Sequence, residues 1–142
     1  MGIFKPDAVF DSITEISYDF LREHQIEGLL LDIDNTLIDT SRELKDDIVN
    51  WVLKAKEQGF KAMILSNTNK SKKYIPISER LDLKYIIFAK KPLKKGFLDA
   101  SKMLGIELPK LAMIGDQVLT DVVGANRVGA FSVYVKPIHQ KE

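Results

Sequence analysis

The stretch GLLLDIDNTL, residues 28–37, decides the fold, because an apolar run leads there directly into two acidic residues. Four further short apolar runs follow along the chain: KAMIL at 61–65, YIIFA at 85–89, LAMI at 111–114 and FSVYV at 131–135. Nearly continuous apolar runs of this length are typical of strands that are buried on both faces, as in a parallel sheet. The sequence therefore predicts a central parallel sheet with five strands.

Segments with helical periodicity separate these runs. Apolar side chains at helical spacing run through residues 44–55, 97–104 and 118–128, and a glycine follows each segment, which is a typical helix stop. The segment 71–81 contains Pro76, which we expect to kink or delay a helix. Strands that alternate with helices predict an α/β domain, here a Rossmann-like three-layer sandwich with right-handed crossovers.

The composition fits one soluble globular domain. The chain has 142 residues, of which 45% are hydrophobic and 29% charged, so it can bury a core of its own. We expect a single domain over residues 1–142, in which residues 1–27 form a helical extension packed on the core. Ile13, Ile16 and Phe20 give this extension an amphipathic spacing.

Charge and cysteine content exclude several classes of protein. There are 21 basic and 20 acidic side chains, so the chain is no globally basic nucleic-acid binder, and no nucleic-acid partner is expected. Cysteine is absent, which excludes disulfides, thiolate catalysis and cysteine metal sites. The charged, proline-containing start lacks the apolar run of a signal peptide. The predicted location is the cytoplasm, and a peripheral position at the inner face of a membrane stays open.

The residues that follow each apolar run are the candidates for chemistry, because ligands of open α/β sheets bind beyond the carboxyl ends of the strands. Polar residues stand at four of these five ends: Asp32, Asp34, Asn35 and Thr36, then Ser66 and Asn67, then Lys90 and Lys91, then Asp116 and Asp121.

Three carboxylates, those of Asp32, Asp34 and Asp116, are expected to converge on a small volume. Like charges a few ångströms apart need a cation or a proton between them. Oxygen ligands without histidine or cysteine select a hard ion, and Mg²⁺ fits best. Ser66 and Lys91 add a hydroxyl donor and a positive charge that suit phosphate oxygens. The sequence therefore predicts a Mg²⁺ site that works together with a phosphate.

Each of these residues also has an ordinary structural explanation. A lone Asp-x-Asp is most often a loop feature, Ser66 and Asp121 read best as helix caps, and Lys91 as a solvated surface lysine. Taken singly, each ordinary explanation is the better one. Their occurrence together, in order at successive strand ends, favours the functional interpretation.

The ordered set resembles the motifs of a known family. DIDNT at 32–36, Ser66, Lys91 and GDQVLTD at 115–121 resemble motifs I to IV of the haloacid dehalogenase (HAD) superfamily. GLLLDIDNTL, the AKKP segment and GDQVLTDVVGANRVG are similar to the capless subclass III phosphatases, in particular the YqeG-like branch, which is similar to phosphatidylglycerophosphate phosphatases. This resemblance covers nearly the whole chain from residue 28 onward.

The resemblance implies a role for each residue. Asp32 is the nucleophile, which forms an aspartyl-phosphate, and Asp34 is the general acid and then the base for water. Asp116 binds Mg²⁺ together with Asp32 and the backbone carbonyl of Asp34. The implied phosphate-holding residues are Ser66 and Lys91, and the supporting or substrate-side residues are Thr36, Asn67 and Asp121. The implied activity is a Mg²⁺-dependent phosphomonoester hydrolase, with phosphatidylglycerophosphate as the substrate.

The spacing of the motifs limits the surroundings of the site. Residues 37–65 and 67–90 each have room for about one helix and one strand, and therefore for no inserted cap domain. An open site suits a large substrate, a phospholipid headgroup, or a site that another subunit of an oligomer completes. A soluble sugar phosphate, a nucleotide or a phosphoprotein is the alternative substrate.

Lysines are frequent in the two loops around Ser66 and Lys91. The seven are Lys70, Lys72, Lys73, Lys90, Lys91, Lys94 and Lys95. A solvated face and an attraction for a polyanionic substrate or an anionic membrane explain the other six equally well. The apolar residues Phe4, Val9 and Phe10 could rest on a membrane, but we expect them to pack on the sheet.

Two other classes of protein remain to be weighed. A phosphorylation-dependent receiver domain is also α/β with acids, a hydroxyl and a lysine, but here the lysine precedes the fourth-strand acid. A non-catalytic module that binds a phospho-ligand or a protein on a HAD-like core is the other alternative. No proposed catalytic side chain is missing, which argues against it, and metal-dependent turnover discriminates the two.

Overall fold

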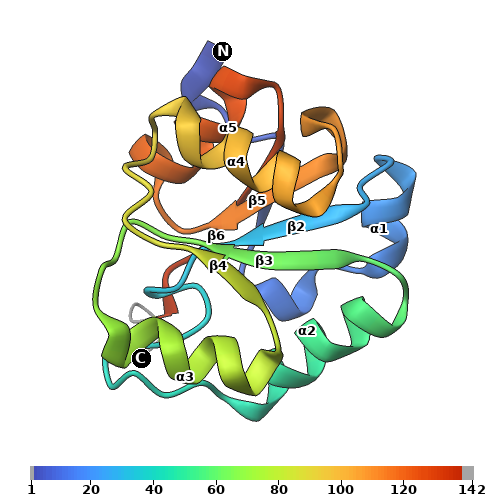
Figure 1. Cartoon of the computed structure of the whole chain (residues 1–142). Coiled ribbons are helices and arrows are strands. Elements are labelled where there is room, and N and C mark those ends of the chain that lie inside the picture. Colours follow the sequence, from blue (N-terminus) through green and yellow to red (C-terminus); the bar gives the residue numbers. More distant parts are fainter. Residues whose placement is uncertain (1, 139–142) are drawn as a thin grey trace.

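The centre of the molecule is one parallel sheet of six strands, which a computed structural model places within residues 2–138, the part of the chain that the structure describes. The strands are β1 (Ala8–Phe10), β2 (Gly28–Leu31), β3 (Lys61–Leu65), β4 (Lys84–Ile86), β5 (Leu111–Gly115) and β6 (Phe131–Val135). Their order in the sheet is β1-β6-β5-β2-β3-β4 (Figure 1). Strand β2 therefore lies between β3 and β5, and its residue Leu30 is in register with Met63 and Met113.

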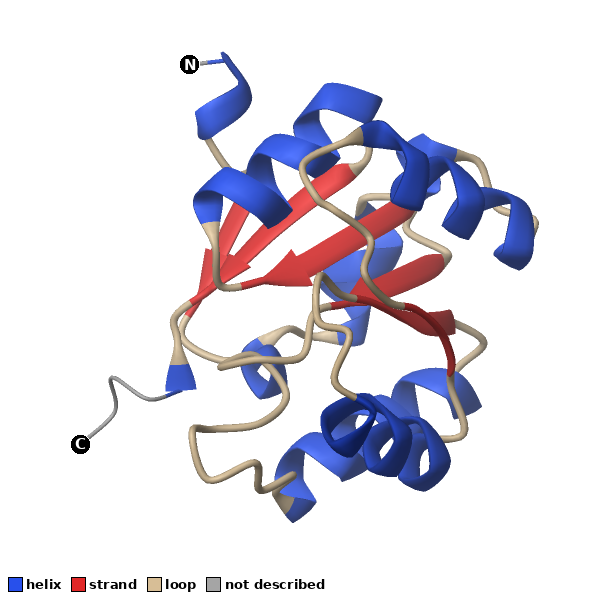
Figure 2. Ribbon diagram, turned by 60° about the vertical axis from the view of Figure 1, so that its left-hand side comes forward, coloured by secondary structure: helices blue, strands red, loops and turns tan. Residues whose placement is uncertain are grey.

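Helices cover both faces of the sheet, as Figures 1 and 2 show. They are α1 (Tyr18–Glu23), α2 (Asp46–Glu57), α3 (Ser71–Leu81), α4 (Lys94–Leu104) and α5 (Val123–Val128), with 3-10 turns η1 (Gly2–Phe4), η2 (Ile13–Glu15) and η3 (Leu108–Lys110) and a π-helical turn η4 (Val118–Val122). Helices α1, α2 and α3 contribute to one apolar core, and α4 and α5 to the other. The predicted three-layer α/β sandwich is confirmed.

The sheet has one strand more than the sequence predicts. The additional strand β1 pairs with β6, where Ala8 is in register with Val133. With three residues, β1 is too short to show a periodicity of its own. The expected N-terminal amphipathic helix is instead two short pieces, η2 and α1, and Ser17 between them caps α1 through its Oγ, which accepts the N–H of Phe20.

The N-terminal segment is packed on the sheet only in part. Ile13 is fully buried and Phe10 packs at the edge of the same core, whereas Phe4 and Val9 are exposed. The indole of Trp51 in α2 donates to the carbonyl of Ile16 at 2.9 Å, which fastens the segment to the core.

The sequence predicted that Pro76 would kink or delay a helix in this segment. Helix α3 nevertheless begins at Ser71, so the proline does not delay it. Proline in a helix interior costs about 3 kcal/mol, because it removes an N–H donor and crowds the preceding turn. Ile77 and Leu81 are buried against the core, and the burial of one such side chain contributes about 1.5–3 kcal/mol. Packing of these two side chains therefore offsets the cost of the proline.

The topology brings the candidate residues to one edge of the sheet. From β2 the chain passes through α2 to β3 and through α3 to β4, and it then returns to the other side of β2 as β5 and β6. A ligand crevice is expected where the strand order reverses, at the carboxyl ends of β2 and β5. Within residues 2–138 no cap domain is inserted between these elements.

None of the helices in residues 2–138 combines the length and the apolar character needed to cross a membrane.

Candidate active site

Three carboxylates meet where β2 and β5 end. Asp32 directly follows β2 and donates its N–H to the carbonyl of Ile114 in β5 at 3.1 Å. Asp116 directly follows β5, and Asp121 lies in the next turn, η4. One carboxylate oxygen from each of the three lies within 4.8 Å of the others. The reason is the parallel pairing, which ends both strands at the same height.

The ammonium of Lys91 lies inside this cluster. Its Nζ donates to Asp121 Oδ1 at 2.6 Å, to Asp32 Oδ1 at 3.2 Å and to the carbonyl of Leu65 at 2.8 Å. The lysine side chain is only 1% exposed and that of Asp32 only 13%. Since all three N–H bonds of the ammonium meet an oxygen, the burial of its charge is compensated. Lys91 is therefore not a solvated surface lysine.

Burial and the charge of the partner shift the pKa values of Asp32 and Lys91 in opposite directions. Burial raises the pKa of Asp32 to about 7, although Lys91 lowers it, and the neighbouring Asp121 raises it further. Burial alone would lower the pKa of Lys91, but the charges of Asp32 and Asp121 outweigh it and raise that pKa above its ordinary value. The lysine therefore stays protonated, and the crowded carboxylates retain a need for positive charge.

Ser66 and Asn67, at the end of β3, contact the loop that carries Lys91. The side chain of Asn67 donates to the carbonyl of Lys91 at 3.1 Å and accepts the N–H of Lys91 at 2.7 Å. Ser66 is buried, and its Oγ accepts the N–H of Thr68 at 3.1 Å. It caps no helix, because α3 begins later, after Lys70. The paired hydrogen bonds of Asn67 fix the height at which Lys91 enters the site.

Asp121 is also no helix cap. It lies inside η4, and its second oxygen accepts the N–H of Gln117 at 3.3 Å while the first binds Lys91. Gly115 leaves room for it, because a Cβ there would lie 2.1 Å from the Asp121 carboxylate. It therefore lies beside the lysine, and the supporting role implied for it stays a prediction.

Asp34 and Thr36 lie at the side of the cluster. Asp34 is not among the three close carboxylates, and its Oδ1 instead accepts from the ammonium of Lys73 at 2.8 Å. Its side chain is 44% exposed, so a ligand can reach it. Thr36 is buried, and its hydroxyl makes no hydrogen bond within the described part of the chain.

The pairing of Lys73 with Asp34 was missed at the level of sequence. Lys73 stood out only as one of seven lysines in two loops. The two residues are 39 positions apart, and their contact depends on how α3 is rotated against the loop after β2. No local spacing rule carries that information.

The donor set fits a magnesium ion. Asp32 and Asp116 offer carboxylate oxygens close together, and no sulfur or nitrogen ligand lies in the cluster. Both oxygens of Asp121 have partners, Lys91 and the N–H of Gln117, whereas Lys91 contacts only one oxygen of Asp32. These two carboxylates are therefore the residues that could hold the ion, and the predicted third contact, from the backbone of Asp34, stays a prediction.

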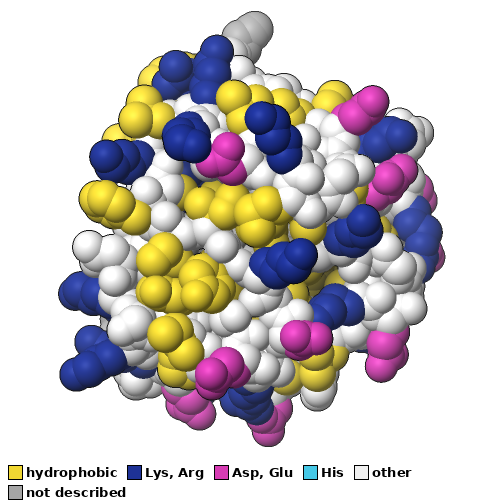
Figure 3. Space-filling view, viewed as in Figure 1, with side chains coloured by type: hydrophobic (Ala, Val, Ile, Leu, Met, Phe, Trp, Pro, Cys, Tyr) yellow, Lys and Arg dark blue, Asp and Glu magenta, His cyan; other side chains and the backbone are white. Residues whose placement is uncertain are grey.

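Exposed apolar side chains surround this edge of the sheet. Phe88 and Leu93 follow β4 and are 57% and 54% exposed, and Leu119 in the turn after β5 is 68% exposed. The ammonium of Lys90 lies over the Phe88 ring, 5.0 Å from its centre. At the left of Figure 3, where Figure 1 has the loop after β4, apolar side chains stand between basic ones.

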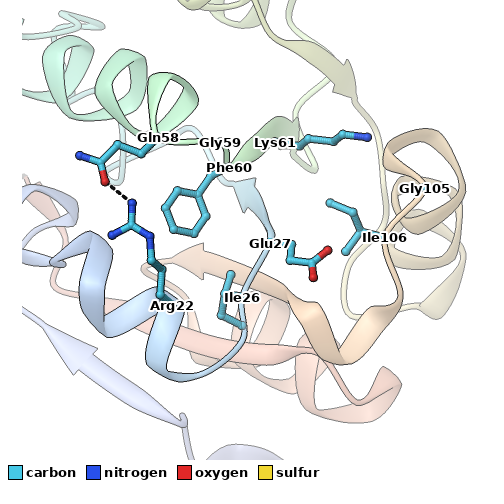
Figure 4. Close-up of a pocket in the computed structure, with 9 residues that line it drawn as sticks. All are labelled: Arg22, Ile26, Glu27, Gln58, Gly59, Phe60, Lys61, Gly105 and Ile106. Atoms are coloured by element: carbon cyan, nitrogen blue, oxygen red, sulfur yellow. Dashed lines mark hydrogen bonds between the residues drawn. The ribbon is translucent and has the colours of Figure 1, made fainter.

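A second pocket lies at the opposite edge, where β2 and β3 begin. It measures about 330 Å³, and Figure 4 shows Arg22 reaching Gln58 beside the ring of Phe60. It has one acidic residue in its lining, Glu27, and none of the clustered carboxylates. Because ligands of α/β sheets bind at the carboxyl edge, chemistry is expected at the Asp32 cluster and not here.

The fold and the acidic cluster define a phosphatase of the HAD superfamily without a cap domain. A solved HAD phosphatase from Thermococcus onnurineus superposes with a TM-score of 0.57 at 27% identity, over 65% of this chain and 46% of that one. The chain belongs to the family described as "Mitochondrial PGP phosphatase", which matches residues 2–138.

Two curated relatives cover nearly the whole chain. The first is "Probable phosphatase YqeG" of Bacillus subtilis (strain 168), 35% identical over 136 residues, which is 95% of this chain and 78% of that one. The second is "Phosphatidylglycerophosphate phosphatase 1, chloroplastic" of Chlamydomonas reinhardtii, 26% identical over 142 residues. The match covers 94% of this chain but only 53% of the algal protein. The resemblance to capless phosphatases of this branch is thus confirmed.

Proposed function

We propose that the chain is a Mg²⁺-dependent phosphomonoester hydrolase that works through an aspartyl-phosphate on Asp32, with phosphatidylglycerophosphate as its substrate. The observation that carries the proposal is the buried Lys91 ammonium, held between Asp32 and Asp121 beside the carboxylate of Asp116. A nucleophile, a fixed positive charge and two carboxylates that could hold an ion, all in one place, are what phosphoryl transfer needs.

The first step forms the covalent intermediate. A carboxylate oxygen of Asp32 attacks the phosphorus while the bond from phosphorus to the alcohol oxygen breaks. Asp34, in its protonated form, gives its proton to the departing oxygen, so that a neutral alcohol leaves. Lys91 and the Ser66 hydroxyl face the negative charge of the transferring group. A bound Mg²⁺ would supply additional positive charge against the same oxygens.

The second step releases phosphate. Asp34, now ionised, takes a proton from a water molecule, whose oxygen attacks the phosphorus. The bond from phosphorus to Asp32 breaks, which restores both carboxyl groups to their starting state. The exposure of the Asp34 side chain supports this role, because both the leaving alcohol and the water must reach it.

The family and the surface support a lipid substrate. The algal relative's name states phosphatidylglycerophosphate, and an open site without a cap leaves room for a large substrate. The exposed Phe88, Leu93 and Leu119 beside lysines offer apolar tips and positive charge, which together suit the surface of an anionic bilayer. We therefore propose peripheral contact with the inner face of a membrane.

Phosphate release tests the proposal. Hydrolysis of an aryl phosphate and of phosphatidylglycerophosphate would be measured with and without Mg²⁺, for the native chain and for Asp32→Asn. We expect turnover that needs Mg²⁺, disappears in Asp32→Asn and is fastest on the lipid. Preference for a sugar phosphate, nucleotide or phosphoprotein would keep the mechanism and replace the substrate. No hydrolysis by a folded chain that binds Mg²⁺ would support a non-catalytic phospho-ligand module instead.

A further inference from the structure

A polar cleft lies beside Asp34, outside the cluster that binds Lys91. It measures about 400 Å³, and its lining residues are Asp34, Asn35, Asp39, Thr40, Arg42, Lys70 and Lys73. They come from two loops, one that follows β2 and one that leads from β3 into α3. Every lining side chain is polar or charged, so the cleft is built for a hydrophilic group.

The cleft has positive charge to spare. Three cations face two carboxylates, and one pair, Lys73 with Asp34, is already formed at 2.8 Å. The carboxylate of Asp39 is turned to its own loop, where it accepts from the N–H groups of Ser41 and Glu43. Within residues 2–138 the side chains of Arg42 and Lys70 make no ion pair. These two cations are therefore available to an anionic ligand.

The position of Asp34 tells which part of the substrate reaches this cleft. The group that gives a proton to the departing oxygen must lie on the leaving-group side of the phosphorus. Asp34 lines the cleft, so the alcohol that leaves extends into it. This step depends on the proposed function, in which Asp34 is the general acid.

We propose that Arg42 and Lys70 bind a second phosphate carried by the leaving alcohol, with Lys73 between this phosphate and Asp34. The substrate proposed above has this chemistry, since it is a phosphomonoester whose alcohol bears a further phosphate ester a few carbon atoms away, and the new assignment is that of the two cations to that second phosphate. The guanidinium of Arg42 can contact two phosphate oxygens at once, which favours it for this contact. A phosphodiester in a lipid headgroup and a phosphate on a soluble polyol share this chemistry.

Kinetics on matched substrates test the subsite. The two-phosphate substrate is glycerophosphoglycerophosphate, and glycerol 3-phosphate is the reference with one phosphate. For the native chain we expect a kcat/KM at least about tenfold higher on the two-phosphate substrate, the effect of one charge-assisted hydrogen bond. Arg42→Ala and Lys70→Ala are each expected to reduce this ratio about tenfold, mainly through KM. Lys84→Ala, which removes an exposed lysine from the opposite edge, serves as the control.

A comparison of lipid and soluble substrates identifies the source of the second phosphate. Faster turnover of phosphatidylglycerophosphate in micelles than of the free headgroup would assign the cleft to a lipid. Equal rates would assign it to a soluble bisphosphate. A ratio that Arg42→Ala and Lys70→Ala leave unchanged would overturn the subsite in both cases.

Binding of glycerophosphoglycerol, which has the diester but no monoester, separates the subsite from the reaction. Calorimetry on the native chain is expected to detect binding that Arg42→Ala weakens about tenfold and Lys84→Ala does not. If no substrate is hydrolysed but this binding pattern holds, the proposed function fails and the subsite stands. The subsite is overturned, whatever the hydrolysis result, if the native chain does not bind glycerophosphoglycerol. It is also overturned if Arg42→Ala and Lys84→Ala change this binding equally.

Discussion

Lys91 holds the active edge together because it is the only cation among three carboxylates whose oxygens lie within 4.8 Å of one another, among the residues that the structure describes. An ammonium at this depth persists only with full compensation, and Asp32, Asp121 and the carbonyl of Leu65 provide it. The same contacts fix the lysine where a phosphoryl group on Asp32 would need it.

Replacement of Lys91 with methionine is expected to affect both stability and activity. The carboxylates of Asp32 and Asp121 would lose their buried partner. With a chelator present to remove metal ions, this loss is expected to lower the free energy of unfolding by about 3 kcal/mol. Removal of the fixed charge lowers kcat at least about 100-fold. Urea unfolding and phosphate release measure the two effects. Added Mg²⁺ is expected to stabilise the variant more than the native chain.

Lys95→Met is the matched control for this substitution, because Lys95 forms an exposed pair with Asp99. It is expected to change the free energy of unfolding by less than about 1 kcal/mol. Equal losses in Lys91→Met and Lys95→Met would contradict the role of the buried ammonium.

The proposed role of Asp34 as general acid predicts a dependence of the rate on the leaving group. Asp34→Asn cannot protonate an alcohol, so the phosphorylation step is expected to slow by 10²–10⁴ on glycerol 3-phosphate, an order of magnitude typical of general acids. An aryl phosphate needs little protonation, and its burst of phenol release is expected to persist. Rapid-quench and stopped-flow measurements follow the two reactions. A burst that disappears along with alkyl hydrolysis would exclude Asp34 as the general acid.

The sequence predicted only part of the set of carboxylates that meet. It placed Asp34 with Asp32 and Asp116, but the structure has Asp121 in that position and pairs Asp34 with Lys73. Asp32, Lys91, Asp116 and Asp121 come together because parallel strands end at one edge, a rule that needs only the order of the elements. The pairing of Lys73 with Asp34 depends on side-chain direction and helix rotation. Those follow from core packing, which a spacing pattern does not contain.

At the scale of elements, Gly124 allows helix α5 to pack closely against the loop that carries Lys91, because glycine has no side chain. A Cβ on Gly124 would lie 2.6 Å from the ring of the fully buried Phe97 and 3.3 Å from Pro92, the residue after Lys91. Glycine in a helix costs about 0.5–1 kcal/mol relative to alanine, so propensity alone favours alanine here. The close approach of α5 to α4 therefore explains why position 124 is glycine and not alanine.

Gly124→Ala is expected to destabilise the fold by about 1–2 kcal/mol, because overpacking costs about 1–3 kcal/mol and exceeds the gain in helix propensity. Urea unfolding measures the change. In the background of Phe97→Leu the same substitution is expected to cost less, since the smaller side chain leaves space for the methyl group. An equal cost in both backgrounds would show that the ring is not the obstacle.

Elements with strong patterns were predictable and short ones were not. Strands β2, β3, β5 and β6 lie within the apolar runs or extend them by one residue. Strand β1 has three residues, and β4 ends at Ile86, before the apolar run does. The loop after β4 leaves the sheet early, because the N–H of Phe88 donates to the carbonyl of Thr68 and that of Ala89 to the carbonyl of Ser66. Both hydrogen bonds join distant parts of the sequence.

At the scale of the whole molecule, one edge of the sheet carries the acidic cluster, the polar cleft and exposed apolar side chains. Helices fill both faces of the sheet, so the loops at the strand ends are where function can be placed without disturbing the core. The proposed lipid substrate would stay anchored in the membrane while its headgroup reaches Asp32 at this open edge.

Membrane contact through this edge predicts binding to anionic vesicles. Sedimentation with equal parts phosphatidylglycerol and phosphatidylcholine is expected to bind the native chain, and binding is expected to weaken as salt screens the lysines. Leu119→Ser and Leu93→Ser each remove an exposed apolar tip worth about 1.5 kcal/mol or more when buried, and are expected to weaken binding about tenfold. Met103→Ser, at the far end of α4 and 45% exposed, is the control and should bind normally. Unchanged binding of Leu119→Ser and Leu93→Ser would mean that the lysines act alone, without insertion of the apolar tips, and equal losses in all three variants would contradict contact through this edge.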